Sequence, residues 1–483
     1  WRKMRHCCGD ALAKAAILAS FIKRCAKMPA FWQILAEIWF RSPSMISALL
    51  PLLSSTAALD APIAWRGGRP VSRALFLHHV AAVARRLPPA RYIFNLCEDR
   101  YGFLVAFAAV GVNGQINLLP SSRARLHVQQ LAADYPDNRA ITDADLERWL
   151  DPTPVTTAAS AIPELSDEQV IAIAFTSGST GRASPHPKTW GELVRGAGQT
   201  RQRFGFAQTM AIVATVPPQH VYGLETSIMA PLVSGVSIHT GRPFFPADVG
   251  AALATVPAPR VLVTTPLHLR ACVAAGLRWP AVVFLLSATA PLTADLAAQA
   301  EEAFGAPVLE IYGCTETGAI ASRRTVVGQR WRLYDGLRLG DGGLFDPQRS
   351  APFVLNDIVE PCGEFEFKLL GRREDLINIA GKRTSLDYLN HQLNQIAGVV
   401  EGVFVMPEAT GSELRRLMVV VVAPGVSERQ LLAALAQRLD PVFLPRPLIK
   451  VAALPRNATG KLSREDLLAL VDPRQPSTVA RHE

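Results

Sequence analysis

The sequence lacks the features of a disulfide-rich secreted protein and of a membrane-spanning one. Its seven cysteines are odd in number and contain no Cys-x-x-Cys pair, which argues against a disulfide framework and against a zinc site. No apolar run reaches the roughly 18 residues that a transmembrane helix needs. Scattered, unpaired cysteines are typical of a reducing compartment, so we expect a cytoplasmic protein.

A net excess of positive charge is nearly absent from most of the chain, although the whole chain has a net charge of +9. Residues 1–45 hold eight Lys and Arg against two acidic residues, and so carry +6 of that total. A basic excess confined to one terminal segment does not indicate nucleic-acid binding. Because this segment also has an apolar stretch at 11–22, we interpret it as a peripheral basic tail. A signal-like segment and weak contact with a membrane surface are the alternatives.

What the chain does have is apolar sequence, at 49% hydrophobic residues against 19% charged ones, which is enough for a large core. Six short runs are apolar on both faces, which is typical of parallel strands covered by helices on both sides. These runs lie at 90–96, 170–175, 210–216, 260–265, 281–287 and 307–313, with helix-period segments at 247–256 and 293–304. The pattern predicts an α/β fold whose large N-terminal domain has mixed and parallel sheets flanked by helices.

The pattern changes in the last quarter of the chain. A charged, turn-like stretch at 371–383 is followed by a helix at 386–396, two strand runs, and a helix whose Ser427 and Gln430 have capping-box spacing. We therefore expect a small, mobile C-terminal α+β domain. The predicted divisions are a basic segment at 1–45, a large domain at 46–372, a small domain at 373–473 and a loose tail at 474–483.

A dense run of hydroxyl and glycine residues directly follows the apolar run at 170–175. Glycines let a backbone approach a polyanion closely, and free backbone N–H groups and hydroxyls can donate to phosphate oxygens. A Walker-type loop does not fit, because the residue before Lys188 is Pro187 rather than glycine. The predicted phosphate-binding residues are Thr176, Ser177, Gly178, Ser179, Thr180 and Gly181.

Three further motifs occur in order along the chain: "IYGCTET" at 311–317, "LGRREDLINIAGKR" at 370–383 and "LPRNATGKLSRE" at 454–465. Together with "TSGSTG" at 176–181 they resemble the core motifs of the adenylate-forming (AMP-binding) superfamily. That superfamily includes acyl- and aryl-CoA synthetases, peptide-synthetase adenylation domains and luciferases. The resemblance covers about residues 60–470 and points to a divergent acyl- or aryl-acid AMP ligase branch.

The resemblance implies that ATP and a carboxylic acid, aromatic or fatty acyl, give an acyl-adenylate and pyrophosphate. The acyl group then passes to a phosphopantetheine thiol, on CoA or on an acyl carrier protein. Positioning and electrostatics dominate such chemistry. By the same resemblance Glu316 is a ligand for Mg²⁺, Thr315 contacts the α-phosphate and Tyr312 faces the adenine.

The remaining roles also follow from the resemblance. Asp357 and Arg372 match the ribose-binding aspartate and arginine, and Lys461 matches the lysine that reaches the carboxylate and the α-phosphate. Glu374 stands at the position of the hinge between two poses of the small domain, and Gly381 matches the glycine along the thiol tunnel.

The carboxylic acid is predicted to lie beside "PPQHVYGLE" at 217–225 and "SATAPL" at 287–292. His220 positions the acid in this interpretation, although a core histidine is an equal alternative. Tyr222 and Ala288 line the pocket. Ala288 and Thr289 replace two glycines of the family pattern, which narrows the pocket and favours a small or flat acyl group.

One lysine departs from the family pattern. The usual loop lysine is replaced by Ser184, and Lys188 follows seven residues after Gly181. Either Lys188 does the same electrostatic work on the nucleotide, or the hydroxyls and backbone suffice. The altered loop also leaves open a catalytically silent nucleotide-binding protein, against which Glu316 and Lys461 argue.

Overall fold

The computed structural model describes residues 47–55, 57–150, 161–177, 183–340, 343–347, 352–372, 376–379, 382–406, 417–456, 462 and 464–471. The predicted basic segment and C-terminal tail lie outside these residues. The described residues from Leu50 onward group into one compact unit. None of the helices in the described part of the chain has the length and hydropathy needed to cross a bilayer.

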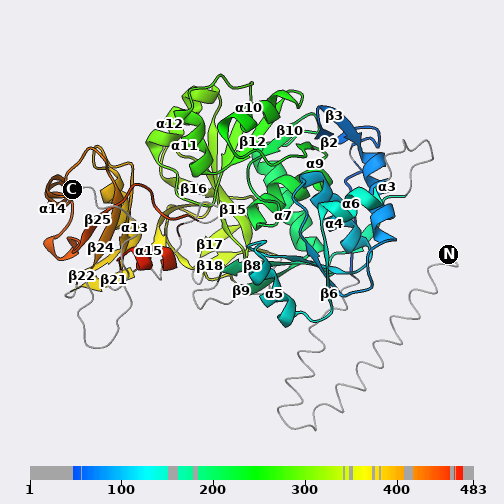
Figure 1. Cartoon of the computed structure of the whole chain (residues 1–483), viewed down its shortest axis with the longest axis horizontal. Coiled ribbons are helices and arrows are strands. Elements are labelled where there is room, and N and C mark those ends of the chain that lie inside the picture. The colour runs from blue at the N-terminus through cyan, green and yellow to red at the C-terminus, as the bar shows by residue number, and fades with distance from the viewer. Residues whose placement is uncertain are drawn as a thin grey trace, which may run out of the picture. The chain divides into compact units, whose positions relative to one another are not determined.

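An eleven-stranded sheet forms the centre of the large domain (Figure 1). Its middle strands β11, β10, β12, β13 and β14 pair in parallel, as the predicted apolar runs require, while β15, β16, β19 and β20 continue it in antiparallel fashion. In sheet order the strands are β19 (Asp357–Pro361), β20 (Glu366–Arg372), β16 (Arg330–Leu333), β15 (Gly318–Arg324), β14 (Val308–Cys314), β13 (Phe284–Ser287), β12 (Arg260–Thr264), β10 (Ala211–Ala214), β11 (Ser237–His239), β2 (Pro62–Arg66) and β3 (Arg69–Ser72).

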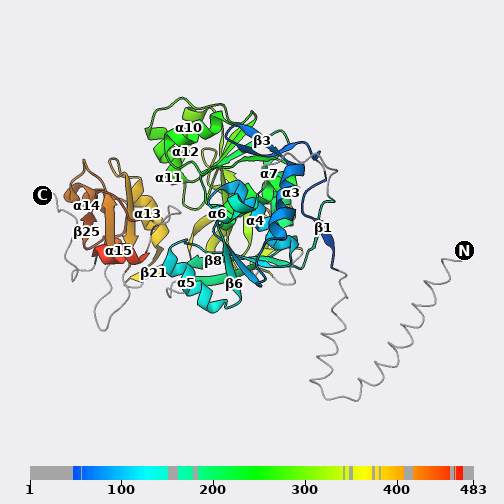
Figure 2. The same ribbon diagram turned by 45° about the vertical axis from the view of Figure 1, so that its right-hand side comes forward.

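Helices cover both faces of this sheet, which explains why its strands are apolar on both sides. In β12, Leu262 packs in one core with α10 (Pro246–Ala254), α11 (Pro266–Ala274) and α12 (Ala294–Phe304). Its neighbours Val261 and Val263 belong to the opposite core, which includes residues of α4 (Arg100–Val112) and α7 (Trp190–Phe204). The α10–α12 group stays together on one side in both views (Figures 1 and 2).

A second sheet has the strand order β6-β4-β5-β8-β9. Helix α4 contacts both this sheet and the large one, so it lies between them. The strands are β4 (Tyr92–Asn95), β5 (Ile116–Leu119), β6 (Asn138–Ile141), β8 (Val170–Ser177) and β9 (Ala183–Thr189). The other large-domain elements are β1 (Leu49–Pro51), α3 (Arg73–Ala84), α5 (Arg125–Asp134), α6 (Asp143–Trp149), β7 (Glu164–Ser166), α8 (Val221–Leu224), the π-helix η1 (Glu225–Met229), α9 (Ala230–Ser234), β17 (Arg338–Gly340) and β18 (Gly343–Phe345).

The segment after residue 376 forms its own core. Leu389 and Leu393 of α13 pack with Val419 and Val421 of β24 and with residues of α14. The elements are β21 (Leu376–Ile379), β22 (Lys382–Ser385), α13 (Leu386–Asn394), β23 (Glu401–Val405), β24 (Met418–Val422), α14 (Glu428–Ala436), η3 (Pro441–Phe443), β25 (Leu448–Lys450) and α15 (Arg464–Val471).

Details of this segment both confirm and correct the sequence analysis. The capping box of Ser427 and Gln430 is present at the start of α14. The turn-like reading of residues 371–383 is wrong in part, because β20 continues to Arg372 and β21 and β22 form an antiparallel hairpin. Strand β21 is short and mostly apolar, with Asn378 between Ile377 and Ile379, and its charged flanks hid the strand in the sequence. The placement of the domain boundary at 372/373 stays a prediction.

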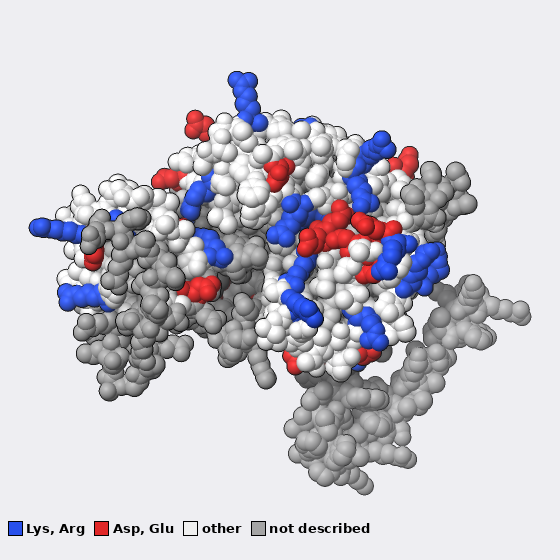
Figure 3. Space-filling model, viewed as in Figure 1, with Lys and Arg blue, Asp and Glu red and all other residues white. Residues whose placement is uncertain are grey.

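Charged side chains are dispersed over the face of the described residues drawn in Figure 3. Acidic side chains gather at one place on the large domain, and several Lys and Arg side chains surround them. No continuous basic stripe runs across this face of the described part.

Thr289, just beyond the end of β13, has a φ of +80° and is the one non-glycine residue with positive φ in the described ranges. A β-branched residue in the left-handed region is strained by roughly 1–2 kcal/mol. Its buried hydroxyl also has no hydrogen-bond partner among the described residues. The chain therefore keeps threonine here at a cost to stability.

We expect Thr289→Gly to raise the free energy of unfolding by about 1 kcal/mol, because glycine relieves the strain and removes an unpaired hydroxyl. Thr293→Gly is the matched control. Thr293 has a φ of −75° and caps α12 through a hydrogen bond from the Leu296 amide, so its replacement should lower stability. Thermal and urea unfolding measure both changes. Destabilisation by both variants would contradict the strain at Thr289.

Candidate active site

The predicted phosphate loop joins two antiparallel strands, β8 and β9. Thr176 lies opposite Ser184, and Ser177 lies opposite Ala183, so residues 178–182 connect the two strand ends. Gly178, Ser179, Thr180 and Gly181 themselves lie outside the described residues. The segment after Gly181 contains Pro185 and Pro187, yet it forms the regular strand β9 at the edge of its sheet, where proline is tolerated.

A second hairpin, between β14 and β15, carries Glu316. The turn Thr315–Thr317 follows a bulge at Tyr312 and Gly313, a distortion that often re-aims side chains beside active sites. Two glycines make the turn sterically possible. Gly318 has a φ of +75°, and a Cβ on Gly313 would lie 2.1 Å from the Gly318 carbonyl oxygen.

His186 connects the two hairpins, and sequence analysis missed it. Its Nε2 lies 3.0 Å from the Thr176 Oγ1, and its Nδ1 lies 4.0 Å from the Glu316 Oε1. The only sequence-level indication is the alternation of "SPHPKT", which places His186 and Lys188 on one face of β9. The first residues of the phosphate loop and the predicted metal ligand are therefore neighbours.

The Glu316 carboxyl is an anion at neutral pH. Burial pushes its pKa upward, but hydrogen bonds from Cys314 and from the backbone outweigh that effect. The charges of His186 and Lys188 act in the same direction, so the pKa of Glu316 lies below its ordinary value. An ionised carboxylate is the ligand that Mg²⁺ prefers in proteins.

The donor set around Glu316 fits a shared magnesium ion. No group of three or more His, Cys, Asp and Glu that could hold a metal occurs among the described residues. Mg²⁺ is commonly bound by one or two carboxylates together with phosphate oxygens of a nucleotide. Glu316 can hold the ion in that way, and the ion would neutralise negative charge on the phosphates.

The predicted nucleoside-binding residues come together on neighbouring strands. The Tyr312 hydroxyl donates to Asp357 Oδ2 at 2.6 Å, although 45 residues separate them. Asp357 begins β19 and is the register partner of Arg372 on β20. The Tyr312 ring also packs against Trp331 and Phe367, which fixes its plane. The Arg372 side chain lies outside the described residues.

The predicted acid-binding residues lie at the ends of two parallel strands. The hydroxyl of the partly buried Tyr222 donates to the Leu286 carbonyl at 2.9 Å, which brings Tyr222 to the end of β13, two residues before Ala288. His220 is the N-cap residue of α8 and makes no side-chain cap hydrogen bond. Ligands of open α/β sheets bind at this carboxyl edge.

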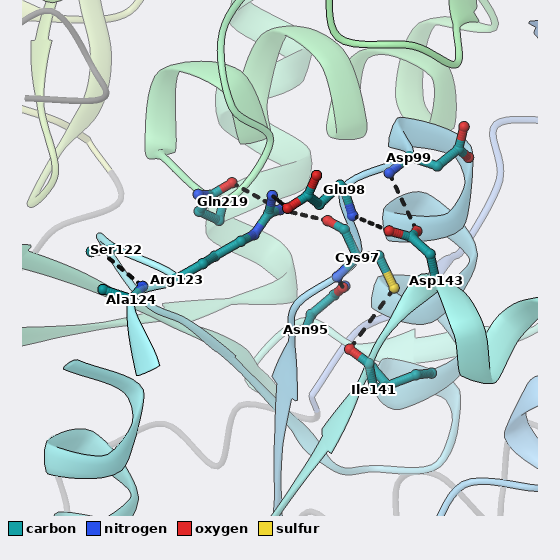
Figure 4. A network of polar contacts seen from close by, with 10 residues as sticks. All are labelled: Asn95, Cys97, Glu98, Asp99, Ser122, Arg123, Ala124, Ile141, Asp143 and Gln219. Atoms are coloured by element: carbon teal, nitrogen blue, oxygen red, sulfur yellow. Dashed lines mark hydrogen bonds and ion pairs between the residues drawn. The ribbon is translucent and has the colours of Figure 1, made fainter. Parts of the chain in front are cut away.

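Arg123, which sequence analysis did not single out, supports the segment that contains His220 (Figure 4). Its guanidinium donates to the Cys97 carbonyl and, at 3.3 Å, to Gln219 Oε1. Glu98 lies 3.9 Å away and is mostly exposed. Arg123 thus links the loop after β5 to the residue that precedes His220.

Arg100 holds the other side of this segment. Its buried guanidinium donates to the carbonyls of Ala214 and Val216 at 2.9 and 2.7 Å, and to the Ser227 hydroxyl. Burial lowers the pKa of Arg100 to about 9. The end of β10 is therefore fixed by hydrogen bonds from α4.

Lys188 is buried and points away from solvent. Its Nζ donates to the Glu316 carbonyl oxygen at 3.1 Å. The predicted contact between Lys188 and the nucleotide stays a prediction. Glu374, Gly381 and Lys461 lie outside the described residues, and their predicted roles likewise stay predictions.

Sequence comparison finds relatives among CoA ligases. The chain is 28% identical over 302 residues to the 4-coumarate–CoA ligase of Rhodobacter capsulatus, covering 61% of this chain and 75% of the relative. It is 24% identical over 332 residues to the 2-succinylbenzoate–CoA ligase of Staphylococcus epidermidis, covering 62% and 69%.

Structural comparison finds the same fold. The o-succinylbenzoate CoA synthetase of Bacillus subtilis, bound to its acyl-adenylate, aligns with a TM-score of 0.69 at 18% identity over 87% of this chain and 98% of that one. A benzoate CoA ligase from Burkholderia xenovorans aligns with a TM-score of 0.67 at 18% identity over 85% and 96%. A sequence model of AMP-binding enzymes matches residues 82–338, more than half of the chain. The chain belongs to the family of AMP-binding enzymes.

Proposed function

We propose that this protein is an AMP-forming acid–thiol ligase. A carboxylate oxygen of the acid attacks the α-phosphorus of ATP, the bond from that phosphorus to the bridging oxygen breaks, and pyrophosphate leaves. The sulfur of CoA then attacks the acyl carbon and AMP leaves. The observation that carries this proposal is the meeting of the β8–β9 and β14–β15 hairpins at His186 and Glu316.

The chain's own residues position and neutralise charge in the first step. Glu316 holds Mg²⁺, Thr315 and the loop 176–181 donate to phosphate oxygens, and the Tyr312–Asp357 pair orients the nucleoside. Lys461 brings a second positive charge to the reacting carboxylate and the α-phosphate. Glu374 is the proposed hinge for the change to thioester formation, in which Gly381 lines the thiol path.

The acid is proposed to be aromatic in preference to fatty acyl. The relatives named above are ligases of 4-coumarate and 2-succinylbenzoate. Ala288 and Thr289 narrow the predicted pocket for the acid. The hydroxyls of Ser287 and Thr289 are buried and lack hydrogen-bond partners among the described residues. Such groups need a partner, which favours an aromatic acid with polar ring substituents.

The acceptor is proposed from the relatives, and the compartment is proposed from the cysteines. CoA is the proposed acceptor because the relatives are CoA ligases, and an acyl carrier protein is the alternative that a direct assay separates. Cytoplasmic location is supported by the four cysteines in the described residues, all of which are free thiols. The alternative of a catalytically silent nucleotide-binding protein is not supported, because Glu316 is ionised and can bind Mg²⁺.

We expect carboxylate-dependent exchange between ATP and pyrophosphate across a panel of benzoates, cinnamates and fatty acids. Glu316→Gln and Lys461→Ala should each reduce the exchange rate by roughly 100-fold, because each removes one preorganised charge. Removal of Mg²⁺ with EDTA should abolish exchange. Glu302→Gln, an exposed position on α12, is the matched control and should exchange normally.

Absence of exchange with every acid would refute the ligase assignment. Full exchange in Lys461→Ala would refute the role of that lysine alone. Thioester formation measured with CoA and, separately, with a phosphopantetheinylated carrier protein then identifies the acceptor.

Tyr312→Phe should weaken AMP binding about tenfold, because the phenol no longer fixes Asp357 for the ribose; a hydrogen bond to a charged group contributes about 1.5–3 kcal/mol. Calorimetric titration with AMP measures the affinity. Tyr92→Phe, on β4, is the control for the loss of a hydroxyl. Unchanged AMP affinity in Tyr312→Phe would show that the Tyr312–Asp357 pair does not serve the nucleoside.

A further inference from the structure

The turn that carries Glu316 is held from both sides by charged groups of other elements. On one side, the Lys188 ammonium on β9 donates to the Glu316 carbonyl oxygen at 3.1 Å. On the other side, the Ala319 amide donates to the Glu225 Oε2 on η1 at 3.1 Å. Neither contact involves the Glu316 carboxylate.

Both holding groups are buried. Lys188 is 5% exposed and Glu225 is 6% exposed. Burial raises the pKa of Glu225 to about 7, while the Ala319 amide and the Lys188 charge oppose that rise. Opposite charges inside a protein compensate each other's loss of hydration, whereas a single buried charge is strongly destabilising. The charges of Lys188 and Glu225 therefore favour each other, and each residue contacts the backbone of the same β14–β15 hairpin.

The Glu225 carboxylate leaves little free space around the turn. A Cβ on Gly318 would lie 2.2 Å from Glu225 Oε1, and a Cβ on Gly196 of α7 would lie 3.4 Å from the same atom. The carboxylate is thus packed between the β14–β15 hairpin and α7. Glu225 also opens a π-helical turn, a distortion that is frequent at functional sites.

The strand that supplies Lys188 also supplies His186. In the β8–β9 pair these two residues lie opposite Ala172 and Ala174, so their side chains share one face of the strand. Lys188 contacts the backbone of Glu316, and His186 approaches its carboxylate at 4.0 Å. The strand that leaves the phosphate loop therefore sets the position of the metal-binding turn.

We propose that Lys188 and Glu225 are positioning residues for adenylate formation: they fix the Glu316 turn, and Lys188 acts through that turn rather than on the nucleotide. This inference rests on the proposed function, because adenylate formation is the step that needs Glu316 and Mg²⁺. Thioester formation has no such need for the turn. The displaced lysine thus serves the metal ligand, not the phosphate loop.

The test compares Glu225→Gln, Lys188→Met and the double variant. Glutamine keeps the shape of Glu225 and can still accept from the Ala319 amide, so it removes only the charge. The matched control is the exposed ion pair Lys368–Glu360 on β19 and β20, replaced by Lys368→Met and Glu360→Gln. Thermal unfolding verifies that each variant is folded.

Three quantities are measured: the Mg²⁺ dependence of binding of a non-hydrolysable ATP analogue by calorimetry, acyl-adenylate formation in a single turnover, and thioester formation from presynthesised acyl-adenylate and CoA. We expect each single variant to slow adenylate formation 10- to 100-fold and to raise the Mg²⁺ requirement several-fold. Thioester formation should stay within about twofold. The double variant should resemble the single ones, because one unit is lost.

Each other result overturns the proposal in a distinct way. A strong effect of Lys188→Met with none of Glu225→Gln would mean that Lys188 contacts the nucleotide directly. Equal losses in both half-reactions would mean that the pair serves only stability. If Lys188→Met fails to fold, Glu225→Gln tests the proposal by itself: slower adenylate formation with unchanged thioester formation supports it, and unchanged adenylate formation overturns it. Wild-type protein without any adenylate formation would instead contradict the proposed function.

Discussion

The site depends on the burial of both faces of the parallel strands at the centre of the large sheet. Helices α10–α12 cover one face of these strands and α4 and α7 cover the other, so both faces are buried. Side chains that contact a polar ligand are therefore expected where these strands end. β13 ends at Ser287 beside the predicted acid wall, and β14 ends at Cys314 before the Glu316 turn.

Two antiparallel hairpins, β8–β9 and β14–β15, supply the other part of the candidate site. The contacts between them are polar and specific: His186 lies near the Glu316 carboxylate, and Lys188 donates to the Glu316 backbone. Within the β8–β9 hairpin, Thr176 contacts His186. Strand register sets these contacts. A shift of one residue in β9 would turn His186 and Lys188 to the opposite face and place the prolines toward Glu316. The predicted metal ligand Glu316 is therefore contacted by a strand that carries none of the predicted catalytic residues; Lys188 was predicted to bind the nucleotide.

Predictions from the sequence were confirmed where they depended on residues close together in the chain. The six apolar runs became β4, β8, β10, β12, β13 and β14, and the Ser427 capping box was found as expected. Strand β9 was missed because its prolines contradict strand propensity unless the strand is known to lie at an edge. Glu225 was missed because its partners, Lys188 and the Ala319 amide, are distant in sequence. Without the fold, nothing in the segment 217–225 distinguishes Glu225 from its neighbours as a buried carboxylate.

The prolines of β9 have one more consequence, which concerns the exposed edge of the sheet. Residues at alternate positions point their N–H groups to the same side, and Pro185 and Pro187 are alternate residues on an edge strand. The outward side of β9 thus lacks two of the donors that another strand would need in order to pair with it. The strand that positions Glu316 is in this way protected against β-sheet aggregation through its open edge.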